Sequence, residues 1–439
     1  MTQSVAGARL ARLGVLAAVS SRLFSRLVGI LFVAVLAHKS SESTVAVYGY
    51  LLGTATLVAT LTDLGVAGIA GREVAAGRLP ADGALAAALP AQAVSILTAC
   101  AITAGLAWVG GPNGLTITPV LLTLAFVAVN GMVNLWSELL RGQSRVKLEA
   151  GIQTLTSVML VVGGLIVVDR GGNASDLLAV VAAKEVIGLL ICWLALRPHR
   201  RPDVIRLRQL AGQSVYLAIA GTAVVILWRE GTILVGAFGS FAALAAYVVA
   251  SRFLDAGVTM ASTIGFGLLP GASAAASDPV TFGHIARRYL ALVTAIGVVV
   301  AVLGFFLASP VTLTVFGERW HDAVPAVRAI SIAVAPIMVG YAAWFLLLAC
   351  DQQRWLAVSA SVGVVVALAV TGVWMVAGSA PLAAAAGTAA GAAVMMVLLL
   401  TRLARVLGTG RGAPPGIPAG PGGSAWSPAE IRTLANEIE

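Results

Sequence analysis

The sequence predicts an all-α polytopic membrane protein with about twelve transmembrane helices in two bundles of six. Hydrophobic residues make up 59% of the 439 residues and charged residues only 11%, whereas soluble domains carry about 25% charged residues. The apolar residues form long runs, and a bilayer core of about 30 Å needs about 20 of them per helix. A transmembrane barrel would instead alternate polar and apolar residues over short strands, and this sequence does not.

Each expected span is a run of apolar residues bounded by a short polar connection. The first run resembles a signal peptide, but Arg22 and Arg26 interrupt it and it is longer than the usual hydrophobic region, so we expect no cleavage. The twelve expected spans are residues 13–37, 44–70, 84–109, 117–140, 150–168, 176–196, 211–238, 242–268, 286–309, 324–349, 355–377 and 380–407.

Lysines and arginines are distributed unequally between the two sides of these spans. With a cytoplasmic N-terminus, eighteen fall in inner connections and flanks and four in outer ones, which is the bias expected for this orientation. We therefore expect a multi-pass protein of the cytoplasmic membrane with both termini in the cytoplasm. The net charge of +9 follows mostly from topology, and it favours membrane lipids rather than nucleic acid as partners.

The most basic interior connection is RPHRRPDVIRLRQ, and it divides the chain into halves. We expect an N-terminal bundle over 1–197, a basic cytoplasmic linker over 198–209 and a C-terminal bundle over 210–407. Internal repeats of this kind occur in secondary transporters, where the substrate path runs between the halves. Residues 408–439 are rich in Gly and Pro, which predicts a flexible cytoplasmic tail. Ser427 begins a candidate short helix within it.

The first two spans carry charged residues far from their ends. Arg22 and Arg26 are four residues apart and share one helix face, and Asp63 lies deep in the second span. A charge at a helix centre costs about 2.5 to 3.5 kcal/mol, so such side chains face a bundle interior or a wet cavity. From these residues alone, a structural role for the arginines and contact with a ligand are equally good interpretations.

Charged residues recur in the seventh and eighth spans. Arg252 and Asp255 are three residues apart and can pair on one helix. Arg229 and Glu230 are adjacent, and adjacent helical residues point in different directions. We therefore expect each of these two side chains to find its partner on another helix.

Two further groups of charges lie in the N-terminal half. Lys184 and Glu185 are adjacent, so we expect them also to pair with other helices. Glu138 lies near Arg141 at the inner end of the fourth span. An interfacial ion pair and a role in the cavity are equally good interpretations of Glu138, and coupling or ion pairing is the candidate role of Glu138, Glu230 and Asp255.

The sequence contains no motif for a cofactor, a metal or an enzymatic reaction. Cys100, Cys192 and Cys350 lie in separate apolar spans, without disulfide or metal spacing. A membrane glycosyltransferase would need catalytic acids in a large external loop, and every expected external loop is short. The loop FGERWHDAVP over 316–325 is the one charged outer turn with aromatic residues; we expect it to be solvated, and contact with a sugar is the alternative.

Five stretches of the sequence carry a family resemblance. They are SRLFSRLVGILFVAVLA from Ser21, VYGYLLGTATLVATLTDLGVAGIAGREVA from Val47, ELLRGQSRVKLEAGIQ from Glu138, AAYVVASRFLDAG from Ala245 and VFGERWHDAVPAVRAI from Val315. The arginine-bearing first helix and the Asp-Leu-Gly of Asp63 to Gly65 are the most specific features. Together these stretches resemble the polysaccharide transport (oligosaccharide flippase) family of the multidrug/oligosaccharidyl-lipid/polysaccharide flippase superfamily.

The resemblance implies a V-shaped, MATE-like fold with a central cavity between two bundles. It also implies a membrane flippase that moves polyprenyl-diphosphate-linked oligosaccharide across the cytoplasmic membrane by alternating access, with polysaccharide biosynthesis machinery as a candidate partner. Arg22 and Arg26 then match the family's basic first helix and would contact the diphosphate, and Asp63 matches its acidic position in helix two. Arg229 and Arg252 are further substrate-binding candidates, chosen from the residues themselves. A MATE-like drug/cation antiporter and a lipid II flippase are the alternatives.

Overall fold

The structure is a computed structural model, and it describes most of the chain between residues 24 and 409. The described residues are 24, 28–63, 66–75, 77, 79–110, 115–143, 145–196, 215–276, 278–377 and 379–409. The side chains of Arg22, Arg26 and Asp63 lie outside the described part, as do the basic linker and the tail beyond residue 409.

Described helices overlap each of the twelve expected spans, the first of them only from Val28, and the predicted all-α membrane fold class is confirmed. Ten described helices are long and apolar enough to cross a membrane, and a shorter apolar helix, Val28–Lys39, precedes them. The others are α2 (Glu42–Asp63), α3 (Val66–Ala75), α4 (Ala81–Gly110), α5 (Ile117–Gly142), α6 (Val146–Asp169), α7 (Ala174–Leu196), α9 (Val215–Phe238), α10 (Phe241–Ala275), α11 (Pro279–Phe316), the 3₁₀ helix η1 (Glu318–Ala323), α12 (Val324–Ala349), α13 (Gln353–Ala377) and α14 (Ala380–Thr409).

Two boundaries differ from those expected. The second span comprises two helices, α2 and α3, on either side of residues 64 and 65. Glycines bring α3 close to α5, because a Cβ on Gly142 would lie 2.5 Å from the carbonyl oxygen of Gly71. The eighth span also continues past its expected end at residue 268, since α10 runs through Pro270 to Ala275; proline is tolerated within transmembrane helices.

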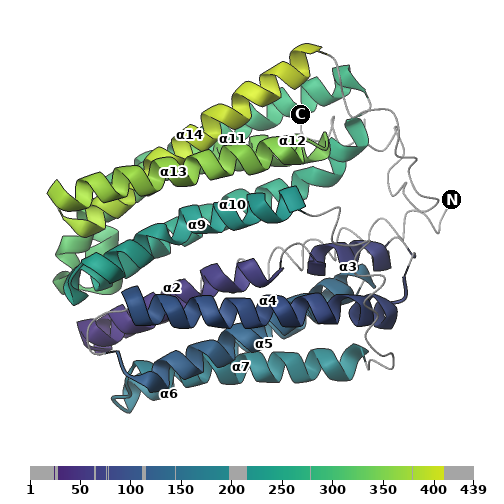
Figure 1. The fold of residues 1–439 in the computed structure, drawn as a ribbon. Helices are drawn as coiled ribbons and strands as arrows, with labels where there is room; N and C mark the ends of the chain where they lie inside the picture. Colours follow the sequence, from purple (N-terminus) through teal and green to yellow (C-terminus); the bar gives the residue numbers. More distant parts are fainter. Residues whose placement is uncertain are drawn as a thin grey trace.

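The helices form two groups that diverge in a V (Figure 1). Helices α2 to α7 make one group and α9 to α14 the other, and the groups separate toward the end where α3 lies. We call the converging end the Ser40 end and the diverging end the Gln143 end. By the distribution of basic residues, the Ser40 end is the predicted outer side.

Glycines allow the two groups to approach closely between α2 and helices α9 and α10. A Cβ on Gly49 would lie 2.3 Å from Val248, and one on Gly53 would lie 2.9 Å from Thr232. Small residues play this part in membranes because close van der Waals packing replaces the hydrophobic driving force between helices.

Side chains from the C-terminal group bind the end of helix Val28–Lys39. Arg319 donates to the carbonyl of Ser40 over 2.7 Å, and Trp320 donates to the carbonyl of Ala37 over 3.3 Å. His38 donates in the other direction, to the carbonyl of Val315 over 3.1 Å. Trp320 is 3% exposed, whereas Glu318, Arg319, His321 and Asp322 are exposed. The turn is therefore solvated as expected except at Trp320, whose indole donates to a carbonyl at the helix end, and the loop joins the two groups.

Candidate functional site

A cavity of about 460 Å³ lies between the two groups of helices. Helix Val28–Lys39, α2, α5 and α6 line one side, and α10 lines the other. The lining residues are Gly29, Ile30, Phe32, Val33, Tyr48, Leu52, Arg141, Glu149, Gln153, Leu160, Arg252, Asp255, Ala256, Thr259, Ser262 and Thr263. The wall therefore combines apolar side chains near the Ser40 end with charged and hydroxyl groups farther in.

The eighth span positions an arginine and an aspartate on this wall. Arg252 lies eleven residues after Phe241, the start of α10, which is about 16 Å along the helix. Its Nη1 is 3.3 Å from Asp255 Oδ2, as the spacing of three residues allows. Arg229 reaches the same carboxylate from α9, with Nη2 2.8 Å from Asp255 Oδ1. Two guanidinium groups thus share one carboxylate in the middle of the expected bilayer.

Hydroxyl groups continue along the same face of α10 toward the Gln143 end. Thr259 donates to the carbonyl of Asp255 over 2.7 Å, and Ser262 donates to the carbonyl of Thr259 over 3.0 Å. Thr263 completes this stripe on the cavity wall. These local bonds satisfy the hydroxyl protons within the helix and leave oxygen lone pairs for a polar ligand.

A second charged group lies at the Gln143 end of the cavity. Arg141 forms ion pairs with Glu138 on its own helix, at 2.5 Å, and with Glu149 on α6, at 3.1 Å. Its Nε is buried without a hydrogen-bond partner in the described part of the chain. The pair of Glu138 and Arg141 is one of the two interpretations that the sequence allowed. The sequence analysis missed Glu149 and Gln153, whose spacing of four residues was an available sign of a shared polar face.

Glu230 points away from Arg229 and into the C-terminal group. It is 2% exposed, and its Oε1 accepts hydrogen bonds from Thr371 on α13, at 3.3 Å, and Thr388 on α14, at 3.2 Å. Its Oε2 and the hydroxyl of Tyr247 are buried without hydrogen-bond partners among the described residues. Arg229 and Glu230 therefore engage different helices, as expected from their adjacent positions.

Lys184 and Glu185 differ from the expectation. They form an ion pair with each other on α7, with side chains 16% and 8% exposed. The expectation assumed that adjacent positions cannot meet, but the lysine chain is long enough to bend back to its neighbour. Neither residue lines the inter-bundle cavity.

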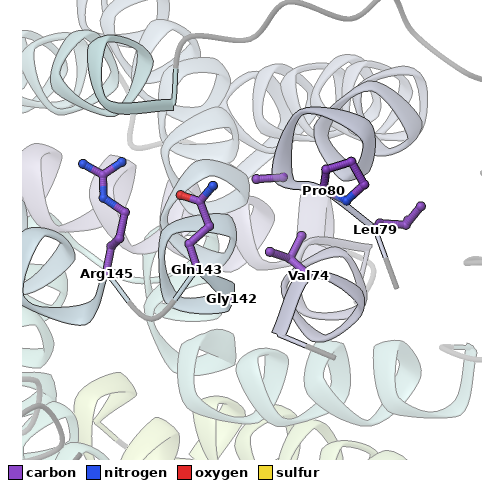
Figure 2. Close-up of a pocket in the computed structure, with 7 residues that line it drawn as sticks. Val74, Leu79, Pro80, Gly142, Gln143 and Arg145 are labelled. Atoms are coloured by element: carbon purple, nitrogen blue, oxygen red, sulfur yellow. The ribbon is translucent and has the colours of Figure 1, made fainter. Parts of the chain in front are cut away.

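A shallower pocket of about 660 Å³ lies at the Gln143 end of the N-terminal group (Figure 2). Arg145 and Gln143 stand on one side and Val74, Leu79 and Pro80 on the other. The Arg145 guanidinium already donates to the carbonyl of Ala195 over 2.8 Å. Because this pocket lies on one group rather than between the two, the inter-bundle cavity is the candidate substrate site.

Metal binding has no support in the described residues, where no three His, Cys, Asp or Glu side chains cluster in a way that could hold an ion.

A family model described as "Polysaccharide biosynthesis protein" matches residues 47–325. The chain belongs to this family. The matched part contains both the cavity-lining α10 and the charged groups around Asp255 and Arg141. No curated protein matches the chain.

Solved structures with the same fold are transporters and flippases. The lipid II flippase MurJ in an inward closed conformation has a TM-score of 0.71 at 12% identity, covering 88% of this chain and 86% of that one. A MOP superfamily transporter from Pyrococcus furiosus has a TM-score of 0.68 at 12% identity, covering 90% and 96%. A MATE protein in complex with MaL6 has a TM-score of 0.66 at 14% identity, also covering 90% and 96%. These likenesses establish the fold of this polysaccharide biosynthesis protein as MATE-like and MurJ-like.

Proposed function

We propose that this protein translocates polyprenyl-diphosphate-linked oligosaccharide across the cytoplasmic membrane for cell-surface polysaccharide biosynthesis, as a transporter rather than an enzyme. The observation that carries the proposal is Arg252, in mid-membrane on the wall of a cavity between two bundles. It shares the carboxylate of Asp255 with Arg229, which is not among the residues that line the cavity. The family match supports a role in polysaccharide production, and the fold supports transport.

The chemistry of a diphosphate fits this cavity. A diphosphate loses water as it crosses a bilayer, and a guanidinium replaces that water with paired hydrogen-bond donors. The stripe of Thr259, Ser262 and Thr263 supplies hydroxyl oxygens to sugar hydroxyls nearby. The lipid tail would remain in the bilayer beside the seam between the bundles. Arg22 and Arg26 would add further donors to the diphosphate, and Asp63 would be the acidic residue of the same site.

Alternating access would follow from the two ends of the molecule. The bundles meet at the Ser40 end, where Arg319 and Trp320 bind the first helix, and diverge at the Gln143 end. This arrangement is that of a carrier open to the cytoplasm, if both termini are cytoplasmic. Cysteines at Ser41 and Asn173 should then react with an impermeant thiol reagent on whole cells, whereas cysteines at Gln143 and Arg354 should not.

Glu230 is the best candidate for the coupling acid. Glu138 and Asp255 pair with arginines, whereas the hydrogen bonds to Glu230 come from two neutral threonine hydroxyls. Neutral partners let a carboxylate take up and release a cation without breaking an ion pair. A buried carboxylate with neutral partners is costly to keep charged. Binding of a cation to Glu230 would therefore depend on how the surrounding helices are arranged.

Reconstituted transport tests the proposal against its rivals. Proteoliposomes should move a polyprenyl-diphosphate oligosaccharide between leaflets and should not export a cationic dye. Arg252→Ala should abolish most of this activity, and Arg170→Ala, which removes an arginine at the Ser40 end outside the cavity, should not. Dye export without lipid movement would make the protein a drug/cation antiporter. Movement of lipid II alone would make it a lipid II flippase.

A further inference from the structure

The two ion pairs of Asp255 are unequal. The Arg229 contact, from α9, measures 2.8 Å, and the Arg252 contact, along α10, measures 3.3 Å. All three side chains are 12 to 15% exposed, so they are only partly hydrated. The Arg229 contact is therefore the one that holds the carboxylate in place, and the Arg252 contact is the one that breaks more easily.

We propose that Asp255 is an internal counter-anion, which occupies on Arg252 the place that a substrate phosphate takes and returns to that place as the substrate leaves. The inference rests on the proposed function. It assigns to Asp255 the control of substrate release, in place of ion coupling or a purely structural ion pair.

The geometry of the carboxylate imitates that of a bound phosphate. Each oxygen of Asp255 accepts from a different guanidinium, as two oxygens of one phosphate group do between two arginines. Arg252 and Asp255 both line the cavity and lie three residues apart on one helix. A phosphate can therefore displace the carboxylate from Arg252, and the contact can reform by side-chain rotation alone.

Arg229 keeps the displaced carboxylate within reach. While a phosphate holds Arg252, Asp255 remains paired with Arg229 and stays beside the substrate. The negative charges of Asp255 and of the substrate phosphate then repel each other, which lowers the affinity for the substrate. The lower affinity favours transport, because a carrier that binds its substrate too tightly cannot release it. In the empty carrier, the same carboxylate balances the charge of two partly buried arginines.

Binding measurements on the purified full-length protein test this role, with geranyl diphosphate as a soluble prenyl diphosphate. Asp255→Asn should lower the Kd roughly tenfold, because it removes the competing charge, and should slow maximal translocation in proteoliposomes. Asp255→Glu keeps the carboxylate and should stay within about twofold of wild type in both measurements. Asp169→Asn is the matched control, because Asp169 also pairs with a basic residue, Lys39, but at the exposed Ser40 end.

A purely structural Asp255 would give a different pattern. Unchanged or weaker binding by folded Asp255→Asn, beside a normal Asp169→Asn, would overturn the proposal. Should Asp255→Asn not fold, Asp255→Ser removes the same charge and leaves both arginines in place, and it should likewise bind more tightly than wild type. Unchanged or weaker binding by folded Asp255→Ser would also overturn the proposal. Failure of the wild type itself to bind the probe would instead count against the proposed function.

Discussion

The guanidinium of Arg319 donates a 2.7 Å hydrogen bond to the backbone carbonyl of Ser40, joining η1 of the C-terminal group to the end of the first helix. The same guanidinium lies 5.1 Å from the ring of Trp320, which itself donates to the carbonyl of Ala37. Both acceptors are carbonyls at a helix C-terminus, where the partial negative charge favours a cation. This contact closes the Ser40 end of the carrier.

Arg319→Ala should loosen that closure. In a background without Cys100, Cys192 and Cys350, a cysteine at Val33 would report it, because Val33 lines the cavity and is 3% exposed. We expect an impermeant thiol reagent on whole cells to label this cysteine several times faster when Arg319 is replaced. Arg170→Ala should leave the rate unchanged. Equal labelling in all three proteins would mean that Arg319 does not hold the end closed.

Gly49 should tolerate no side chain unless Val248 becomes smaller. An alanine Cβ at Gly49 would lie 2.3 Å from Val248 Cγ2, and such overpacking costs about 1 to 3 kcal/mol. Thermal unfolding of Gly49→Ala should therefore begin at a lower temperature. Gly49→Ala/Val248→Ala should recover part of the loss, because it removes both Cγ atoms of Val248 and leaves only the Cβ, at 2.9 Å. Gly105→Ala is the control, because nothing lies within 4 Å of its Cβ position. A double variant no more stable than Gly49→Ala would show that this contact does not limit packing.

Glu230→Gln should uncouple transport from its driving gradient. The amide keeps hydrogen-bonding groups for Thr371 and Thr388 but cannot exchange a cation, so binding of geranyl diphosphate should stay within about twofold of wild type. Stability should be maintained or improved, because a costly buried carboxylate is removed. Translocation rates in proteoliposomes with imposed proton or sodium gradients provide the measurement.

Glu185→Gln is the control for that experiment, since Glu185 is also buried but pairs with Lys184 in the other group. It should retain gradient dependence even with lower stability. Transport by Glu230→Gln that still follows the gradient would assign coupling to another residue.

The twelve spans could be predicted because length and hydropathy alone decide which segments cross a bilayer. The pair Arg252 and Asp255 could also be predicted, since three residues on one helix fix their separation. The Arg229 contact with Asp255 and the threonines around Glu230 could not, because they depend on how α9 packs against α10, α13 and α14. For the same reason the sequence predicted a solvated turn at Trp320, whose acceptor, the carbonyl of Ala37, lies 283 residues away.

We propose that the cavity arginines bind the diphosphate of the substrate. Leaflet translocation of a polyprenyl-diphosphate oligosaccharide by arginine variants tests this most directly. We expect Arg252→Ala and Arg22→Ala/Arg26→Ala to reduce the initial rate at least about tenfold, which corresponds to about 1.4 kcal/mol of lost interaction. Arg252→Lys should be nearly as impaired, because lysine keeps the charge but lacks the planar pair of donors. Full activity in a stable Arg22→Ala/Arg26→Ala protein, or in Arg252→Lys, would show that these arginines only balance buried acids and do not hold a diphosphate.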